Sequence, residues 1–121
     1  MSKILVVDDQ VIVQRLLIET FREDQHEVET AANGAEALRL LIAFEPDLIL
    51  MDIKMPVMNG IEILRQIRTL DSRVTLIIMT SYGDPQAIKQ LKDFGIIYYV
   101  DKPFDLFKLR ERVREILNSL E

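Results

Sequence analysis

The most constraining feature of the sequence is a regular alternation between short aliphatic runs and longer segments of helical period. The aliphatic runs occupy residues 4–7, 27–32, 47–52, 74–80 and 96–100. Runs of this length are typical of strands, and aliphatic strands that alternate with helices are typical of a parallel sheet covered on both faces. Because crossovers between parallel strands are right-handed, we expect a doubly wound α/β fold.

The segments between the aliphatic runs carry helical signals. Apolar residues recur at helical spacing in residues 10–23, in residues 61–70 and in residues from about 105 to 120. Another helix follows the second strand. We expect Ile42, in that helix, and Leu120, in the last one, to face the core.

Two helix starts are marked by capping residues. Asn33 followed three residues later by Glu36 is a capping box, and the helix that it opens is expected to stop before Pro46. Asn33 and Gly34 could instead form a hairpin turn, but the helical period that follows favours the helix. Asp84 followed by a proline marks a further helix start.

Length and composition predict a single globular domain without an output domain. The chain has 121 residues, of which 49% are hydrophobic and 29% are charged, so it can bury a core of its own. The net charge of -5 argues against nucleic acid as a direct partner, because phosphates need a basic surface. The chain has no cysteine, which excludes disulfides and thiolate metal sites.

No segment has the pattern of a signal peptide or a membrane span. The first apolar run is too short for a signal peptide and ends in charged residues. No stretch approaches the roughly 20 apolar residues that a bilayer requires. We therefore expect a cytoplasmic protein that does not bind a membrane.

Polar residues of functional type follow four of the predicted strands. Asp8 and Asp9 follow the first strand, Asp52 ends the third, Thr80 ends the fourth and Lys102 follows the fifth. Each alone would be interpreted as a cap, a turn residue or a surface lysine. In a parallel sheet, however, these ends share the edge at which ligands bind. The three aspartates are therefore expected to form an acidic pocket for a hard divalent cation such as Mg²⁺.

These residues lie in motifs that resemble the receiver domain of bacterial two-component response regulators over the whole chain. The motifs are the Asp8–Asp9 pair, DIKMPVMNG at 52–60, MTS at 79–81 and DKPF at 101–104. The second motif is the most specific, since its proline and glycine stand at fixed distances after the aspartate. Gln10, Lys54, the Tyr82–Gly83 pair and the ending KPFD at 102–105 are also similar to the single-domain receiver of the sporulation phosphorelay.

The resemblance implies a flavodoxin-like (βα)5 fold with strand order 2-1-3-4-5 and one receiver domain over residues 1–121. It implies that Asp52 is the phosphoacceptor and that Asp8, Asp9, Asp52 and the backbone carbonyl of Lys54 bind Mg²⁺.

The resemblance also assigns the remaining site residues. Thr80 and Lys102 would contact the phosphoryl group, and Thr80 and Tyr99 would form the switch that carries the signal to the surface. The Lys102–Pro103 peptide bond would be cis, which proline permits.

The implied function is that of a signalling module with slow self-phosphorylation and self-dephosphorylation. A sensor histidine kinase would donate the phosphoryl group from a phosphohistidine. The receiver would then pass it to a histidine phosphotransferase in a phosphorelay, or act on a downstream target protein through its switched surface. The chemistry agrees, because a carboxylate is a competent nucleophile and phosphoryl transfer depends on positioning and charge neutralisation.

Two other functions compete with this interpretation. Mg²⁺-dependent phosphatases with an aspartate nucleophile need a second acid two residues after it, and Lys54 occupies that position. A degenerate receiver would act as a binding module without phosphorylation, but every expected pocket residue is present.

The first helix carries apolar residues beyond those that a core requires. Val11 and Ile18 are seven residues apart and share a face with Arg15, away from the predicted core side. Because this helix begins beside the pocket, we hypothesise that it docks a four-helix phosphotransfer bundle that carries the donor histidine.

Overall fold

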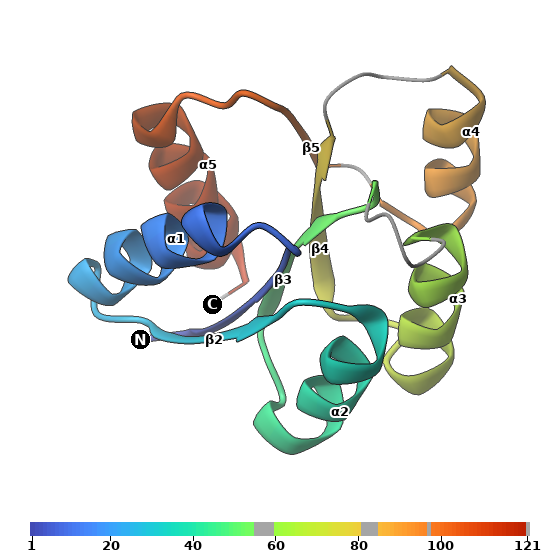
Figure 1. The fold of residues 1–121 in the computed structure, drawn as a ribbon, viewed down its shortest axis with the longest axis horizontal. Coiled ribbons are helices and arrows are strands. Elements are labelled where there is room, and N and C mark those ends of the chain that lie inside the picture. Colours follow the sequence, from blue (N-terminus) through green and yellow to red (C-terminus); the bar gives the residue numbers. More distant parts are fainter. Residues whose placement is uncertain (55–59, 81–84, 97, 121) are drawn as a thin grey trace.

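The computed structural model describes residues 1–54, 60–80, 85–96 and 98–120, and for Thr80 and residues 85–88 it describes the backbone alone. Five strands alternate with five helices in this part of the chain (Figure 1). The elements are β1 (Lys3–Val7), α1 (Val11–Glu23), β2 (Glu27–Ala31), α2 (Gly34–Phe44), β3 (Leu48–Asp52), α3 (Gly60–Leu70), β4 (Thr75–Thr80), α4 (Pro85–Asp93), β5 (Tyr98–Asp101) and α5 (Leu106–Ser119).

The strands form one parallel sheet in the order β2-β1-β3-β4-β5, which confirms the predicted fold and strand order. β1 and β3 lie side by side at the middle of the sheet, with Val7 opposite Met51. The residues that follow Val7 and Met51 are Asp8 and Asp52. The register therefore brings Asp8 and Asp52, at the ends of two neighbouring strands, to the same edge of the sheet.

The helices cover both faces of the sheet. α1 and α5 lie on one face, and α2, α3 and α4 lie on the other (Figure 1). Side chains alternate along each strand, so Ile4 and Val6 pack toward α1 and α5 while Leu5 and Val7 pack toward α2 and α3. Each of these side chains is fully buried. Burial on both faces explains why the strands are continuous aliphatic runs.

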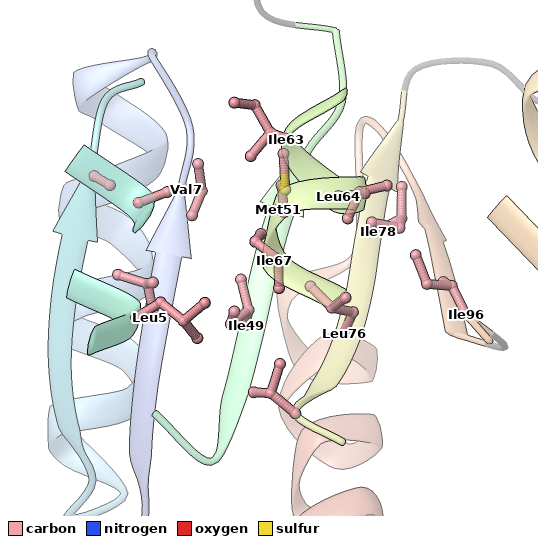
Figure 2. Packing of buried hydrophobic residues seen from close by; sticks show 14 of the residues in the cluster. Leu5, Val7, Ile49, Met51, Ile63, Leu64, Ile67, Leu76, Ile78 and Ile96 are labelled. Carbon is pink, nitrogen blue, oxygen red and sulfur yellow. The ribbon is translucent and has the colours of Figure 1, made fainter. Parts of the chain in front are cut away.

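The α2–α3 face shows how the helices are held to the sheet. In Figure 2, Ile63, Leu64 and Ile67 of α3 point onto Met51 of β3 and Ile78 of β4. All five side chains are buried. Burial of one such side chain contributes about 1.5–3 kcal/mol to folding. The packing therefore fixes α3 relative to the strand that ends in the candidate phosphoacceptor.

The capping prediction for α2 is confirmed. The Asn33 side chain accepts a hydrogen bond from the Glu36 N–H at 2.9 Å, and the Glu36 carboxylate accepts one from the Ala32 N–H at 3.0 Å. The carboxylate thus reaches one residue further back than a capping box requires. α2 ends at Phe44 and is capped by the left-handed residue Glu45, directly before Pro46, as expected.

Two predicted core residues are exposed. Ile42 is 65% exposed because the inward side of α2 is narrow and centres on Ala37 and Leu41. Leu120 is 53% exposed because it follows the last helical residue, Ser119, so the helical period does not place it.

The fifth strand starts later than the sequence predicts. Gly95 has φ of 73° and donates to the Lys92 carbonyl, and the Ile96 N–H donates to the Leu91 carbonyl. These bonds close the end of α4, so Ile96 belongs to the helix termination and β5 begins at Tyr98.

α4 begins at Pro85, and its predicted cap, Asp84, lies outside the described residues. Among the helices of the described part of the chain, none combines the length and the apolar character that a membrane span needs.

Candidate functional site

Asp8 is the most tightly held residue at the carboxyl edge of the sheet. It is fully buried, yet each of its polar groups has a partner. Its N–H donates to the Ala31 carbonyl at 3.0 Å, and its Oδ1 accepts from the Gln10 N–H at 2.8 Å. Its Oδ2 accepts from Lys102 Nζ at 2.6 Å, and its carbonyl oxygen accepts from Gln14 Nε2 at 2.5 Å. These bonds offset the desolvation of a buried carboxylate.

Asp52 lies beside Asp8 as the last residue of β3. It is 6% exposed, so one end of the carboxylate reaches solvent. Its Oδ1 accepts from the Lys54 N–H at 2.9 Å, and its Oδ2 lies 3.1 Å from Lys102 Nζ. A partly exposed carboxylate held by two fixed donors is oriented for attack on an incoming group.

The predicted acidic pocket is present. Carboxylate oxygens of Asp8, Asp9 and Asp52 all lie within 4.8 Å of one another. Asp9 is exposed, and its carboxylate has no hydrogen-bond partner within the described residues. Three carboxylate donors without histidine or cysteine fit a hard, oxygen-preferring cation such as Mg²⁺.

Lys102 neutralises part of this negative charge. It follows β5, and its ammonium group pairs with both buried carboxylates, at 2.6 Å to Asp8 and 3.1 Å to Asp52. Burial favours the neutral amine, but the bonds to Asp8 and Asp52 outweigh burial and raise the pKa of Lys102 above its ordinary value. The Lys102–Pro103 bond is cis, as predicted.

The two predicted switch residues lie near the pocket on neighbouring strands. Thr80 is the last residue of β4 and stands opposite Asp101 of β5, and its side chain lies outside the described part of the chain. The half-buried Tyr99 packs against the hydrophobic cluster on the face that α2, α3 and α4 cover, and its hydroxyl donates to the Ile96 carbonyl at 2.9 Å. Burial raises the pKa of Tyr99.

The glycine of the DIKMPVMNG motif has a steric role. Gly60 opens α3 against the residue that follows Asp52, so an added Cβ at position 60 would stand 2.5 Å from the Ile53 carbonyl oxygen and 2.7 Å from its Cα. No side chain fits there. The middle of the motif, residues 55–59, lies outside the described residues.

Sequence reasoning did not assign two polar residues that contact the pocket. The Gln10 side-chain oxygen lies 3.5 Å from Lys102 Nζ, and Gln14 binds the Asp8 carbonyl. Gln14 is three and seven residues before the buried Leu17 and Phe21, so it stands on the inward side of α1. A polar residue on that side, in the helical turn next to an acidic pocket, was the available signal.

A doubly wound parallel sheet with clustered carboxylates and one lysine at its carboxyl edge defines a class of phosphoacceptor signalling modules. Residues 4–114 match the family described as the response regulator receiver domain. The chain belongs to this family, whose members take part in two-component signalling.

Two relatives are similar to this chain over nearly its whole length. The chain is 41% identical over 116 residues to sporulation initiation phosphotransferase F of Bacillus subtilis, covering 96% of this chain and 94% of that protein. It is 32% identical to chemotaxis protein CheY of Halobacterium salinarum, covering 98% of each.

Among solved structures, the CheY-like receiver domain protein of Methanospirillum hungatei aligns with a TM-score of 0.92 at 28% identity. The alignment covers 98% of this chain and 95% of that one.

Proposed function

We propose that this chain is a stand-alone receiver that takes a phosphoryl group from a phosphohistidine onto Asp52. The observation that supports this best is the state of Asp52, a strand-end carboxylate 3.1 Å from the Lys102 ammonium and next to two further aspartates. The full-length similarity to a sporulation phosphotransferase and to a chemotaxis protein agrees with a receiver that works alone.

In the proposed reaction an oxygen of the Asp52 carboxylate forms a bond to phosphorus. The bond between phosphorus and the donor imidazole nitrogen breaks, and the imidazole leaves with the bonding electron pair and takes up a proton. Lys102 already lies within hydrogen-bond distance of Asp52 Oδ2, so it can move a short distance to an oxygen of the arriving phosphoryl group. Thr80, the last residue of β4, would donate to another.

The acidic pocket would hold Mg²⁺ through Asp8, Asp9, Asp52 and the backbone carbonyl of Lys54. The carboxylate cluster supplies the oxygen donors that this ion prefers. When bound, Mg²⁺ supplies positive charge that lets an anionic nucleophile meet an anionic phosphoryl group.

The proposed switch uses Thr80 and Tyr99. The phosphoryl group carries about 1.5–2 negative charges and three acceptor oxygens. Because the bond to phosphorus uses the charge of the Asp52 carboxylate, the net gain at Asp52 is about one negative charge. Thr80 moves toward these oxygens, and Tyr99 turns into the space that it leaves. In the unphosphorylated form the Tyr99 hydroxyl is held by the Ile96 carbonyl, so the inward turn must break that bond. The switch thus changes the surface formed by α4, β5 and α5.

We propose that α1 docks a four-helix phosphotransfer bundle, as part of the kinase or of a phosphotransferase. The donor histidine must reach Asp52, and α1 starts next to the pocket. Its exposed apolar residues are Val11 at 57%, Ile12 at 82% and Leu16 at 39%. Ile18, expected on this surface from the sequence, is half-buried and packs on the core, so it contributes less than predicted.

Passage of the phosphoryl group along a phosphorelay is the favoured role, since the sporulation relative covers nearly the whole chain. A diffusible effector is the second role, which the chemotaxis relative supports. The arrangement of the site does not favour the phosphatase alternative. Position 54 provides a backbone N–H to Asp52 and carries a lysine in place of the second carboxylic acid that such phosphatases use.

The test is intact-protein mass spectrometry after incubation with Mg²⁺ and acetyl phosphate. We expect wild type to gain one phosphoryl group, and Asp52→Asn protein and an EDTA-treated sample to gain none. A folded wild-type protein that stays unmodified would contradict the proposal and favour a degenerate receiver. Turnover of a generic phosphomonoester would favour the phosphatase.

A further inference from the structure

The start of α1 is held in an unusual way. Its N-cap residue is Gln10, whose side chain makes no capping hydrogen bond. Gln14, one turn later, instead reaches back past the start of the helix and donates to the Asp8 carbonyl oxygen. The Gln14 N–H also donates to the Gln10 carbonyl, so Gln14 ties the helix to both ends of the loop after β1.

This contact restrains the peptide unit between the two aspartates. The Asp8 carbonyl belongs to the same planar unit as the Asp9 N–H, so a bond to that oxygen fixes the direction in which the chain enters Asp9. The Asp8 carboxylate has two partners of its own, Gln10 and Lys102, whereas that of Asp9 has none among the described residues. The direction of the Asp9 carboxylate therefore depends on its backbone.

We propose that Gln14 is a positioning residue that aims the Asp9 carboxylate into the acidic pocket by holding the Asp8–Asp9 peptide. It touches neither the phosphoryl group nor the cation. The inference rests on the proposed Mg²⁺-dependent function of the pocket and extends it to a side chain on α1.

The contact requires a hydrogen-bond donor at position 14, which the Gln14 amide supplies. A carbonyl oxygen only accepts hydrogen bonds, so the Gln14 nitrogen must face it. Gln14→Leu removes the donor and keeps a side chain that suits a helix. Gln14→Glu keeps the size, removes the donor and adds a negative charge near the pocket. Simple electrostatics predicts that this charge tightens cation binding, whereas loss of positioning predicts that binding weakens, so the two explanations give opposite signs.

The experiment is isothermal titration calorimetry of Mg²⁺ into wild type, Gln14→Leu and Gln14→Glu at pH 8. Gln66→Leu, on the exposed side of α3, is the matched control for loss of a glutamine. Loss of a residue that holds a metal ligand in place, without itself touching the metal, typically weakens metal affinity by 10–100-fold. We therefore expect the Mg²⁺ Kd of both Gln14 variants to rise about tenfold. Gln66→Leu should match wild type.

Two further measurements separate positioning from a general loss of structure. At saturating Mg²⁺ the rate of phosphorylation by acetyl phosphate should return close to that of wild type in both Gln14 variants. Hydrogen exchange at the Gln10 amide, which donates to Asp8 Oδ1 across the same loop, should become faster by NMR, while exchange in the β3 and β4 strands stays unchanged. A variant that loses protection throughout the sheet would instead show a purely structural role and overturn the inference.

The outcomes distinguish this inference from the proposed function. If wild type itself binds no Mg²⁺, the proposed function fails. If wild type binds Mg²⁺ and both Gln14 variants bind it equally well, or Gln14→Glu binds it more tightly, the positioning role fails alone.

Discussion

Replacing Gly60 by alanine should damage both stability and the site, because there is no room for a side chain where α3 begins. The added Cβ would lie 2.5 Å from the Ile53 carbonyl oxygen, 2.7 Å from its Cα and 2.8 Å from its Cβ. Carbon atoms make favourable contact at about 3.5–4.0 Å, so one of the two backbone segments must move by about 1 Å. α3 cannot yield easily, because Ile63, Leu64 and Ile67 hold it on the sheet.

The size of the effect follows from two opposing contributions. Alanine favours a helix over glycine by at most about 1 kcal/mol. Forcing atoms into a packed region costs about 1–3 kcal/mol, and here the neighbours are backbone atoms that cannot rotate away. Because the neighbours are backbone atoms, we take the upper end of this range, about 3 kcal/mol, and expect a net loss of about 2 kcal/mol in the free energy of unfolding. With a urea m-value of about 2 kcal/mol/M, the unfolding midpoint falls by about 1 M.

The functional effect comes from the position of Ile53 and Lys54 directly after Asp52. Displacing Ile53 moves the Lys54 N–H that holds Asp52 Oδ1 at 2.9 Å. Phosphorylation by acetyl phosphate should therefore slow even under conditions in which the Gly60→Ala protein is fully folded.

Gly95→Ala is the control. Gly95 has φ of 73° and nothing near its Cβ position. Alanine there costs about 1–2 kcal/mol of backbone strain, at a point remote from Asp52, so the rate of phosphorylation should not change. The reasoning about Gly60 is refuted if Gly60→Ala is as stable as wild type, or if it loses stability but phosphorylates at the wild-type rate.

Three further predictions concern charge, pH and the switch. Lys102→Met leaves buried carboxylates unpaired, so urea unfolding in EDTA should show a loss of stability of about 3 kcal/mol. Added Mg²⁺ should recover much of this loss. A variant as stable as wild type in EDTA would contradict the prediction. Burial lowers the pKa of His26, whose Nδ1 accepts from the Ser2 N–H. Wild type should therefore lose stability relative to His26→Asn as pH falls below 6.5, by no more than about 1.4 kcal/mol per pH unit. If the free energies of unfolding of the two proteins change with pH in parallel, this prediction is wrong. Tyr99→Phe removes the bond to the Ile96 carbonyl and should lower the free energy of unfolding by about 0.5–1.5 kcal/mol. NMR should also show a larger population of the conformer whose ring is turned inward. An unchanged population would show that this bond does not hold the ring in its outward position.

The sequence predicts the sheet well because its signal is local and repeated. Strands buried on both faces must be aliphatic throughout, and five such runs in alternation with helices leave few other architectures. The start of β5 was misplaced for a physical reason. Ile96 is as aliphatic as a strand residue, but its N–H is used to close α4 after the left-handed Gly95. Hydrophobicity does not show to which element a buried residue gives its hydrogen bonds.

The candidate site was predictable to the extent that it depends on strand ends. Asp52 ends a strand and Asp8 and Lys102 each directly follow one, and the parallel topology alone brings them together. Gln14 was not found because its role depends on the angle at which α1 leaves the loop. The exposure of Ile42 has the same origin, since the width of a buried helix face is set by its neighbours and not by its own period.

The charges of the pocket explain why the sequence places two aspartates at the end of a buried strand. Three carboxylates against one ammonium leave two negative charges, which a divalent cation balances. The buried Asp8 is neutralised within the protein by Lys102, whereas the exposed Asp9 has no partner in the described residues and is free to bind a cation. Phosphorylation would replace the single charge of Asp52 by the roughly two charges of an acyl phosphate, so it would add about one negative charge to a pocket that a divalent cation had balanced. Hydrogen-bond donors that move toward the phosphoryl oxygens would compensate this added charge. We propose that their attraction to the phosphoryl group drives the switch.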